Sequence, residues 1–333
     1  MKIFITGSSG FIGFHLSRKL LDKGHSVYGF DSMNSYYDIK IKKDRYKILN
    51  KYKKFSFKKS KLENQKILSK SILEFKPQII IHLAAQAGVR YSIENPRVYL
   101  DTNIIGTYNI IELAKEINIK HLIIASSSSV YGANKNLPFK EIDKTETQLS
   151  IYAATKKSTE SIAHSCSNIW KVPITMLRFF TVYGPWGRPD MALFIFTKNI
   201  LEGKKIDLFN FGNHIRDFTY IDDIIEPILR LINKPPKNNN KTRTNDPSES
   251  SAPFKIYNIG NNNPKKLMEF VKAIESKLNK KAKINLKPLQ KGDVYETYAD
   301  TNKLLQATRY KSKTDIDKGI GNFIDWFRSY YKC

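Results

Sequence analysis

Hydrophobic and polar positions in the first half of the chain alternate between two patterns. Short runs rich in apolar and β-branched residues predict strands at 2–6, 26–30, 55–58, 79–83, 121–126 and 173–179. Between several of them, apolar residues recur every three to four positions, which predicts helices at 11–23, 96–117 and 152–170. Near-continuous apolar strands separated by helices are typical of a parallel sheet with helices on both faces. We therefore expect an α/β protein with a doubly wound parallel sheet.

The second half of the chain is less regular and predicts a smaller unit. Helical patterns occur at 191–202, 222–232, 264–278 and 315–330. The segment 233–254 has few apolar residues, which is typical of a surface loop. We expect a first domain over 1–180 and a mixed α/β C-terminal domain over 181–333, with a strand at 255–260 that returns to the first domain.

Composition and charge narrow the classes of function. The chain has 333 residues, 41% of them hydrophobic, and we find no apolar run long enough to span a bilayer. Its two cysteines, Cys166 and Cys333, form neither a disulfide framework nor a metal-ligand spacing. The start of the chain is better explained as a first strand than as a signal peptide. We expect a cytoplasmic protein with no metal and no membrane partner.

The net charge of +25 raises the question of a nucleic-acid partner. The lysines are dispersed among asparagine, isoleucine and serine, which favours a solvated surface over a nucleic-acid site. Failure to be retained on a polyanion would exclude the nucleic-acid hypothesis. A basic surface would still attract a diphosphate substrate.

A glycine motif follows the first predicted strand and opens the first helix. "TGSSGFIG" places Gly7, Gly10 and Gly13 at the spacing of a dinucleotide-binding turn, with Phe11 and Ile12 inside the motif. The helix N-terminus would face the phosphates. Asp31 ends the second strand, where a carboxylate would bind an adenosine ribose and repel a 2′-phosphate. The alternative is a glycine-rich turn without a ligand; the strand, helix and acid together favour NAD and a Rossmann-type sheet.

A second motif has the residues of an acid–base site. Tyr152 and Lys156 are four residues apart in a predicted helix and therefore share a face. A lysine ammonium beside a phenol would lower the pKa of the phenol and make it a usable base. A serine run, 126–129, follows an upstream strand and could bridge Tyr152 to a substrate hydroxyl. Solvated surface residues and ordinary turn chemistry are the alternatives for each motif alone.

Taken together, these motifs identify a family resemblance. With "HLAAQAGVRYS", "DTNIIGT", "SSSSVYG", "YAATK", "RDFTYIDD" and "YNIG", the chain resembles the extended short-chain dehydrogenases/reductases. Among them it is similar to the bacterial UDP-glucuronate 4-epimerases, including those of capsular polysaccharide synthesis. The resemblance implies NAD-dependent conversion of UDP-glucuronate to UDP-galacturonate through a 4-keto intermediate, with hydride removed from C4 and returned to it. It also implies a homodimer through the helices at 96–117 and 152–170.

The resemblance assigns roles residue by residue. It makes Tyr152 the base, Lys156 its partner and a cofactor contact, and Ser127 the bridge to O4. Further cofactor contacts are Ala84, Ala85, Gln86 and Asn103. The substrate-binding residues it implies are Arg90, Ser128, Ser129, Thr181, Arg188, Phe211, Arg216 and Asp293. One position departs from the family: Lys61 stands where an acidic residue usually meets the adenine amino group. Glu63 or a backbone carbonyl would replace it, or the adenine is held less tightly.

The relatives differ in their site residues, because a fold does not fix a function. Ser128 and Ser129 stand where nucleotide-sugar 4,6-dehydratases carry acidic residues, which argues against elimination. UDP-glucose/galactose 4-epimerases handle a neutral group at C5, whereas a carboxylate there suits the fork of Arg188. A UDP-glucuronate decarboxylase remains the alternative with the same substrate. An NAD-sensing regulator is the non-enzyme alternative, and the intact Ser127, Tyr152 and Lys156 argue against it.

Overall fold

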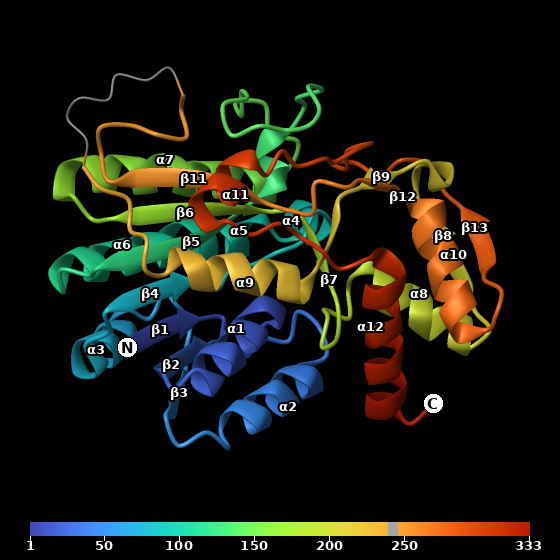
Figure 1. Cartoon of the computed structure of the whole chain (residues 1–333), viewed down its shortest axis with the longest axis horizontal. Coiled ribbons are helices and arrows are strands. Elements are labelled where there is room, and N and C mark those ends of the chain that lie inside the picture. The colour runs from blue at the N-terminus through green and yellow to red at the C-terminus, as the bar shows by residue number, and fades with distance from the viewer. Residues whose placement is uncertain (239–245) are drawn as a thin grey trace.

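The computed structural model describes residues 1–238 and 246–333. Within them, seven parallel strands form the central sheet in the order β11-β6-β5-β4-β1-β2-β3 (Figure 1). Their bounds are β1 Lys2–Thr6, β2 Ser26–Asp31, β3 Phe55–Lys59, β4 Ile79–His82, β5 His121–Ser127, β6 Ile174–Phe179 and β11 Phe254–Ile259. The predicted Rossmann-type doubly wound sheet is confirmed. Because the chain winds outward in both directions from β1 and β4, their carboxyl ends border the crevice where such sheets bind ligands.

The alternation of side chains along each strand builds two hydrophobic cores. Ile3 and Ile5 of β1 join one core, and Phe4 joins the other. The first core is covered by α1 (Phe11–Asp22), α2 (Ile39–Leu49) and α9 (Ile221–Leu231). The second is covered by α3 (Gln65–Phe75), α6 (Gly106–Glu116) and α7 (Ile151–Trp170). Figure 1 shows these two helix layers on opposite faces of the sheet. Burial on both faces explains why the inner strands are rich in apolar residues, as in β4 (IIIH), whereas the edge strand β3 (FSFKK) is largely exposed.

The helix predicted at 96–117 is not a single α-helix. It consists of α5 (Pro96–Tyr99), a π-helical segment η1 (Leu100–Ile105) and α6. The π-helical segment carries Asn103, whose side chain is fully buried. π-Helical turns inside helices often occur at functional sites, because they re-aim side chains. The structure also contains α4 (Val89–Glu94), a 3-10 turn η2 (Ser128–Tyr131) and α11 (Asn302–Thr308).

The smaller part of the chain lies beyond the end of the sheet toward which β1 runs (Figure 1). It contains α8 (Ala192–Leu201), α10 (Leu267–Leu278), α12 (Ile316–Tyr331) and a 3-10 turn η3 (Asn210–Gly212). Short strand pairs complete it: β8 (Lys205–Leu208) with β13 (Lys283–Leu286), β9 (Ile215–Arg216) with β12 (Lys265–Lys266), and β7 (Thr181–Tyr183) with β10 (Phe218–Tyr220). The second half of the chain also supplies β11, which pairs with β6 in the main sheet.

Two features of the described residues bear on the expected function. No helix among them is both long and apolar enough to cross a bilayer. In the same part of the chain, no cluster of His, Cys, Asp and Glu side chains could hold a metal ion. Of the predicted surface loop at 233–254, residues 239–245 lie outside the described residues.

Candidate active site

The glycine motif forms a tight turn between β1 and α1. Gly7 has a φ of 73°, and a Cβ there would lie 2.8 Å from the amide nitrogen of Ala84 in the neighbouring segment. A Cβ at Gly13 would lie 2.0 Å from the Gly7 carbonyl oxygen. Both positions therefore exclude a side chain. The first turn of α1 presents its free amide groups above this loop, which is the arrangement that binds a pyrophosphate.

Asp31 joins the glycine loop to the end of β2. Its carboxylate accepts hydrogen bonds from the amides of Ser9 at 3.0 Å and Met33 at 2.8 Å. Each carboxylate oxygen retains a lone pair that can accept a ribose hydroxyl. Lys42 lies nearby and donates to the Asn34 carbonyl oxygen at 2.7 Å. Burial lowers the pKa of Lys42 to about 8, and the negative charge of Asp31 opposes that shift.

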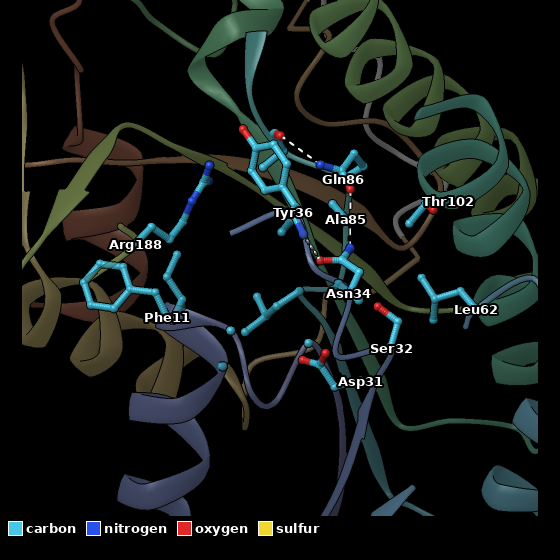
Figure 2. A pocket seen from close by; sticks show the side chains of 18 of the residues that line it. Phe11, Asp31, Ser32, Asn34, Tyr36, Leu62, Ala85, Gln86, Thr102 and Arg188 are labelled. Atoms are coloured by element: carbon cyan, nitrogen blue, oxygen red, sulfur yellow. Dashed lines mark hydrogen bonds between the residues drawn. The ribbon is translucent and has the colours of Figure 1, made fainter. Parts of the chain in front are cut away.

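A cavity of about 520 Å³ opens above this loop at the carboxyl ends of the strands. Figure 2 shows Phe11 and Arg188 on one side of it, Leu62 and Thr102 on the other, and Asp31 at its base. The structure brings most of the predicted cofactor and catalytic residues together here. Those that line the cavity are Gly7, Gly10, Phe11, Ile12, Gly13, Asp31, Ala84, Ala85, Gln86, Ser127, Tyr152, Lys156 and Arg188.

Asn103 lies behind the cavity wall rather than in it. Its side-chain oxygen accepts from the Gln86 amide at 2.8 Å, and its nitrogen donates to the Gln86 carbonyl at 3.1 Å. The same nitrogen donates to the Thr155 hydroxyl at 3.0 Å, one residue before Lys156. Asn103 therefore fixes the segment after β4 against α7 and so aligns two walls of the cavity.

Tyr152 and Lys156 both line the cavity, and burial shifts the pKa of each. Lys156 donates to the Ala125 carbonyl at 2.9 Å, and burial lowers the pKa of Lys156 to about 8, with Glu160 opposing that shift. Burial raises the pKa of Tyr152, while a hydrogen bond with Ser127 and the charge of Arg188 act to lower it. In the chain alone burial therefore outweighs the opposing hydrogen bond and charge, and the lowering of the Tyr152 pKa by Lys156 stays a prediction.

A buried ion pair supports this face of α7. Glu160 and Arg178 are each 2% exposed, and the guanidinium meets the carboxylate through two contacts of 2.9 Å. Ser126 also donates to Glu160 at 2.6 Å, and Arg178 lies 4.8 Å from the ring of Tyr131. The pair ties α7 to β6 and to the end of β5, next to Ser127.

Arg188 enters the cavity from the turn that follows β7. Its side chain is 23% exposed, and its Nε donates to Asp190 at 3.0 Å. Nη2 completes the pair with the second oxygen of Asp190, and this carboxylate outweighs burial and raises the pKa of Arg188. Figure 2 shows the guanidinium reaching toward Tyr36, whose ring centre lies 6.0 Å from Cζ. The arginine predicted to hold a substrate carboxylate thus already has a carboxylate partner on one edge.

The residues predicted to bind the nucleotide lie outside this cavity. Arg216 donates to Asp293 at 3.0 Å, so the two are paired with each other. Phe211 is 58% exposed, and Arg90 lies 4.5 Å from the ring of Phe209. Of the remaining predicted substrate residues, Ser129 hydrogen-bonds Ser127, Ser128 lies beside it in η2, and Thr181 lines a small adjoining cavity that Arg188 shares.

The loop after β2 also contributes to the site, although no sequence motif predicted it. Ser32, Asn34 and Tyr36 line the cavity, and Nδ2 of Asn34 donates to Oε1 of Gln86 at 3.4 Å (Figure 2). Its position in the sequence could have predicted this, because the loop directly follows Asp31 at the ligand-binding edge of the sheet. At the far end of the cavity, Lys61 and Glu63 both line the wall, and Glu63 accepts from the Thr102 hydroxyl at 2.7 Å.

The chain is similar to known proteins along its whole length. Residues 3–260 match the model of the NAD dependent epimerase/dehydratase family. The chain is 54% identical to protein CapI of Staphylococcus aureus, over 100% of both chains. It is 42% identical to UDP-glucuronate 4-epimerase 4 of Arabidopsis thaliana, over 99% of this chain and 76% of the relative. Among solved structures it resembles the UDP-glucuronic acid 4-epimerase of Bacillus cereus in complex with UDP-glucuronic acid and NAD. That match has a TM-score of 0.89 and 32% identity, and covers 99% of this chain and 100% of the other.

Proposed function

Since this chain belongs to the NAD dependent epimerase/dehydratase family, we propose that it is a UDP-glucuronate 4-epimerase that forms UDP-galacturonate. One observation carries the choice of substrate. The guanidinium of Arg188 lines the same cavity as Ser127, Tyr152 and Lys156. A cation that can bind a sugar carboxylate therefore shares one chamber with an acid–base group.

The residues around the cavity fit NAD. The glycine loop has the tight turn and the close helix–strand approach of a dinucleotide-binding site, since Cβ atoms at Gly7 and Gly13 would collide with backbone atoms. Asp31 and Lys42 lie where the adenosine ribose would meet the end of β2. Bound there, NAD would supply the hydride acceptor for C4 of the sugar and the hydride donor for its return. Lys61, Leu62 and Glu63 border the adenine end of the same cavity.

Tyr152 supplies the proton transfer in this proposal. Its phenolate takes the proton of the C4 hydroxyl, and the phenol so formed later gives it back, with Ser127 hydrogen-bonded between phenol and sugar. In the chain alone, burial holds the pKa of Tyr152 high, and the Ser127 hydrogen bond and the Arg188 charge work against burial. Lys156, held by the Ala125 carbonyl, adds a buried positive charge that also faces the cavity.

Arg188 holds the sugar carboxylate in this proposal. A 4-keto sugar with a carboxylate at C5 is a β-keto acid that loses CO₂ readily, so an epimerase must restrain that group. Asp190 occupies the Nε–Nη2 edge of the guanidinium. The edge that carries Nη1 would meet the substrate carboxylate beside Tyr36, because a guanidinium has five N–H donors in a planar fork. Thr181, in the adjoining cavity, would support the same carboxylate.

The nucleotide and the assembly complete the proposal. Arg216 would bind the diphosphate, Asp293 the uridine ribose and Phe211 the uracil, once the present Arg216–Asp293 pair opens.

We also propose a cytoplasmic homodimer through α5–α6 and α7. Exposed apolar side chains on these helices support it, namely Val98, Leu100, Ile105, Tyr108 and Ile169. Size-exclusion chromatography with light scattering tests the dimer, and a monomer at micromolar concentration would contradict it.

The decisive experiment is incubation of purified protein with UDP-glucuronate without added NAD, followed by chromatography of the products. UDP-galacturonate supports the proposal. A UDP-pentose accompanied by CO₂ would make the chain a decarboxylase. Conversion of UDP-glucose with none of UDP-glucuronate would make it a UDP-glucose/galactose 4-epimerase. Retention of NAD without any turnover would favour the regulator.

A further inference from the structure

The turn that carries Arg188 has an unusual backbone. Gly184 has a φ of 143°, and Trp186 has a φ of 59°, in the left-handed region that bulky side chains rarely adopt. For a residue such as Trp186 this conformation is strained and persists only where neighbouring contacts hold it. The contacts that hold this turn therefore decide where Arg188 is placed.

Arg45 of α2 supplies the central contact. Its side chain is fully buried. Nη2 donates to the carbonyls of Trp186 at 2.5 Å and Gly187 at 3.2 Å, the two residues that precede Arg188. Nη1 donates to the Ser9 carbonyl in the glycine loop at 2.9 Å and to the Tyr37 hydroxyl at 3.1 Å. One buried cation thus joins the glycine loop, the loop after β2 and the Arg188 turn.

Other contacts hold the turn from the same side. His15 of α1 lies with Nε2 2.9 Å from the Pro185 carbonyl, and burial lowers the pKa of His15 to about 3. The ring is therefore neutral and donates from Nε2. The Trp186 ring packs against Phe14, Trp326 and Tyr330, with ring centres 5.1–5.5 Å apart. His15 and the aromatic rings therefore hold the turn itself. Of these groups, Arg45 is the one that also donates a hydrogen bond to the glycine loop, at the Ser9 carbonyl.

We propose that Arg45 is a positioning residue that keeps the glycine loop and the Arg188 turn in fixed register, so that the sugar carboxylate is restrained while C4 is oxidised. This rests on the proposed function. The planar fork matters, because one guanidinium reaches four acceptors in three segments. A lysine ammonium, a point charge on a flexible stem, cannot span them all.

Loosening the turn has a defined chemical consequence. In the 4-keto intermediate a freed carboxylate leaves as CO₂ when the C5–C6 bond breaks. Its electron pair passes through C5 to the C4 carbonyl oxygen, and a proton then adds at C5. The product is a UDP-4-keto-pentose, and return of the hydride to C4 gives a UDP-pentose. The ratio of UDP-pentose to UDP-galacturonate therefore reports how firmly Arg188 is held. A general loss of stability would lower the amount of both products without changing this ratio.

The test compares wild type, Arg45→Met and Arg45→Lys, all purified with their retained NAD. We expect the ratio of CO₂ plus UDP-pentose to UDP-galacturonate to rise about tenfold in Arg45→Met, and less in Arg45→Lys, in line with the sensitivity of catalysis to displacements of order 1 Å. We expect kcat to fall more than KM rises. Amide hydrogen exchange should increase at 184–190 and at 7–10 in both variants.

Ile72→Ala is the matched control, since Ile72 is fully buried in α3 in the core on the other face of the sheet. It should lower Tm without changing the product ratio or the exchange at 184–190. The proposal is overturned if folded Arg45→Met keeps the wild-type ratio and exchange, or if Ile72→Ala reproduces both changes.

Two further outcomes are separable. If wild type does not convert UDP-glucuronate, the proposed function fails, and exchange at 184–190 and 7–10 still shows whether Arg45 joins the two segments. If neither Arg45 variant folds, Tyr37→Phe removes one acceptor of the Arg45 fork. Exchange at 184–190 must then rise in Tyr37→Phe, and unchanged exchange there overturns the proposal.

Discussion

The buried pair between Glu160 and Arg178 offers the sharpest test of how the tertiary structure supports the active site. Replacing Glu160 with Gln keeps the size and a hydrogen-bond acceptor but removes the charge. Arg178, 2% exposed, then lacks its two-contact carboxylate partner, and Ser126 loses a charged acceptor. The ring of Tyr131 remains beside the guanidinium but cannot replace a carboxylate.

The cost follows from the burial of both groups. Removing one partner of a buried ion pair costs about 3–5 kcal/mol, because the remaining charge is left without compensation. For a chain of 333 residues that corresponds to a fall in Tm of roughly 4–7 °C. Replacing both residues together, as Glu160→Met with Arg178→Met, should cost less than Glu160→Gln alone, since no uncompensated charge remains.

Activity should respond as well, through Lys156. Burial lowers the pKa of Lys156 to about 8, and the negative charge of Glu160 acts to raise this pKa. Loss of the Glu160 charge therefore lowers this pKa further, and Lys156 loses its proton at a lower pH. The alkaline limb of the kcat profile should move to lower pH in Glu160→Gln.

Thermal unfolding of the three proteins and their pH–rate profiles make the measurement. An unchanged Tm together with an unchanged alkaline limb in Glu160→Gln would refute the role of the pair. A double variant less stable than the single one would show that packing, rather than charge, dominates this site.

Three further predictions concern the cavity. Tyr152→Phe should retain NAD but lose at least about 10²-fold in kcat, the scale of a lost general base; turnover close to wild type would remove Tyr152 from that role. Gly13→Ala should lose NAD and fall in Tm, because its Cβ would lie 2.0 Å from a carbonyl oxygen, whereas Gly321→Ala in α12, where a Cβ meets only a lysine side chain at 3.6 Å, should change neither. Asp190→Asn should raise the proportion of decarboxylated product by roughly tenfold, since Asp190 orients the guanidinium of Arg188; a lower KM with an unchanged product ratio would show instead that Asp190 only competes with the substrate.

Much of the fold was predictable because its signals are local. The strand and helix patterns, the glycine turn and the acid at the end of β2 each lie within one short segment. The parallel sheet then follows, because strands joined by crossover helices run parallel, whereas the strand order is decided by the packed core. The sequence also predicted that the serine run at the end of β5 could bridge Tyr152 to a substrate hydroxyl. Their functional roles remain predictions.

The sequence alone could not give the contacts between distant segments. Arg45 lies in a lysine-rich stretch that looked like solvated surface, yet its side chain is fully buried against a turn more than a hundred residues away. Asp190 was visible beside Arg188, but only the folded turn pairs them. The π-helical segment around Asn103 and the pairing of Glu160 with Arg178 likewise have no local signature.

The physical reason is the range of the forces involved. Backbone preference and hydrophobic periodicity act over a few residues and determined the elements of this protein from its sequence. Burial and the pairing of charges depend on which segments the packed core brings together. The sequence therefore supplied the chemical groups of the site, whereas the tertiary structure decided which of them are buried, which are already paired, and how firmly Arg188 is held.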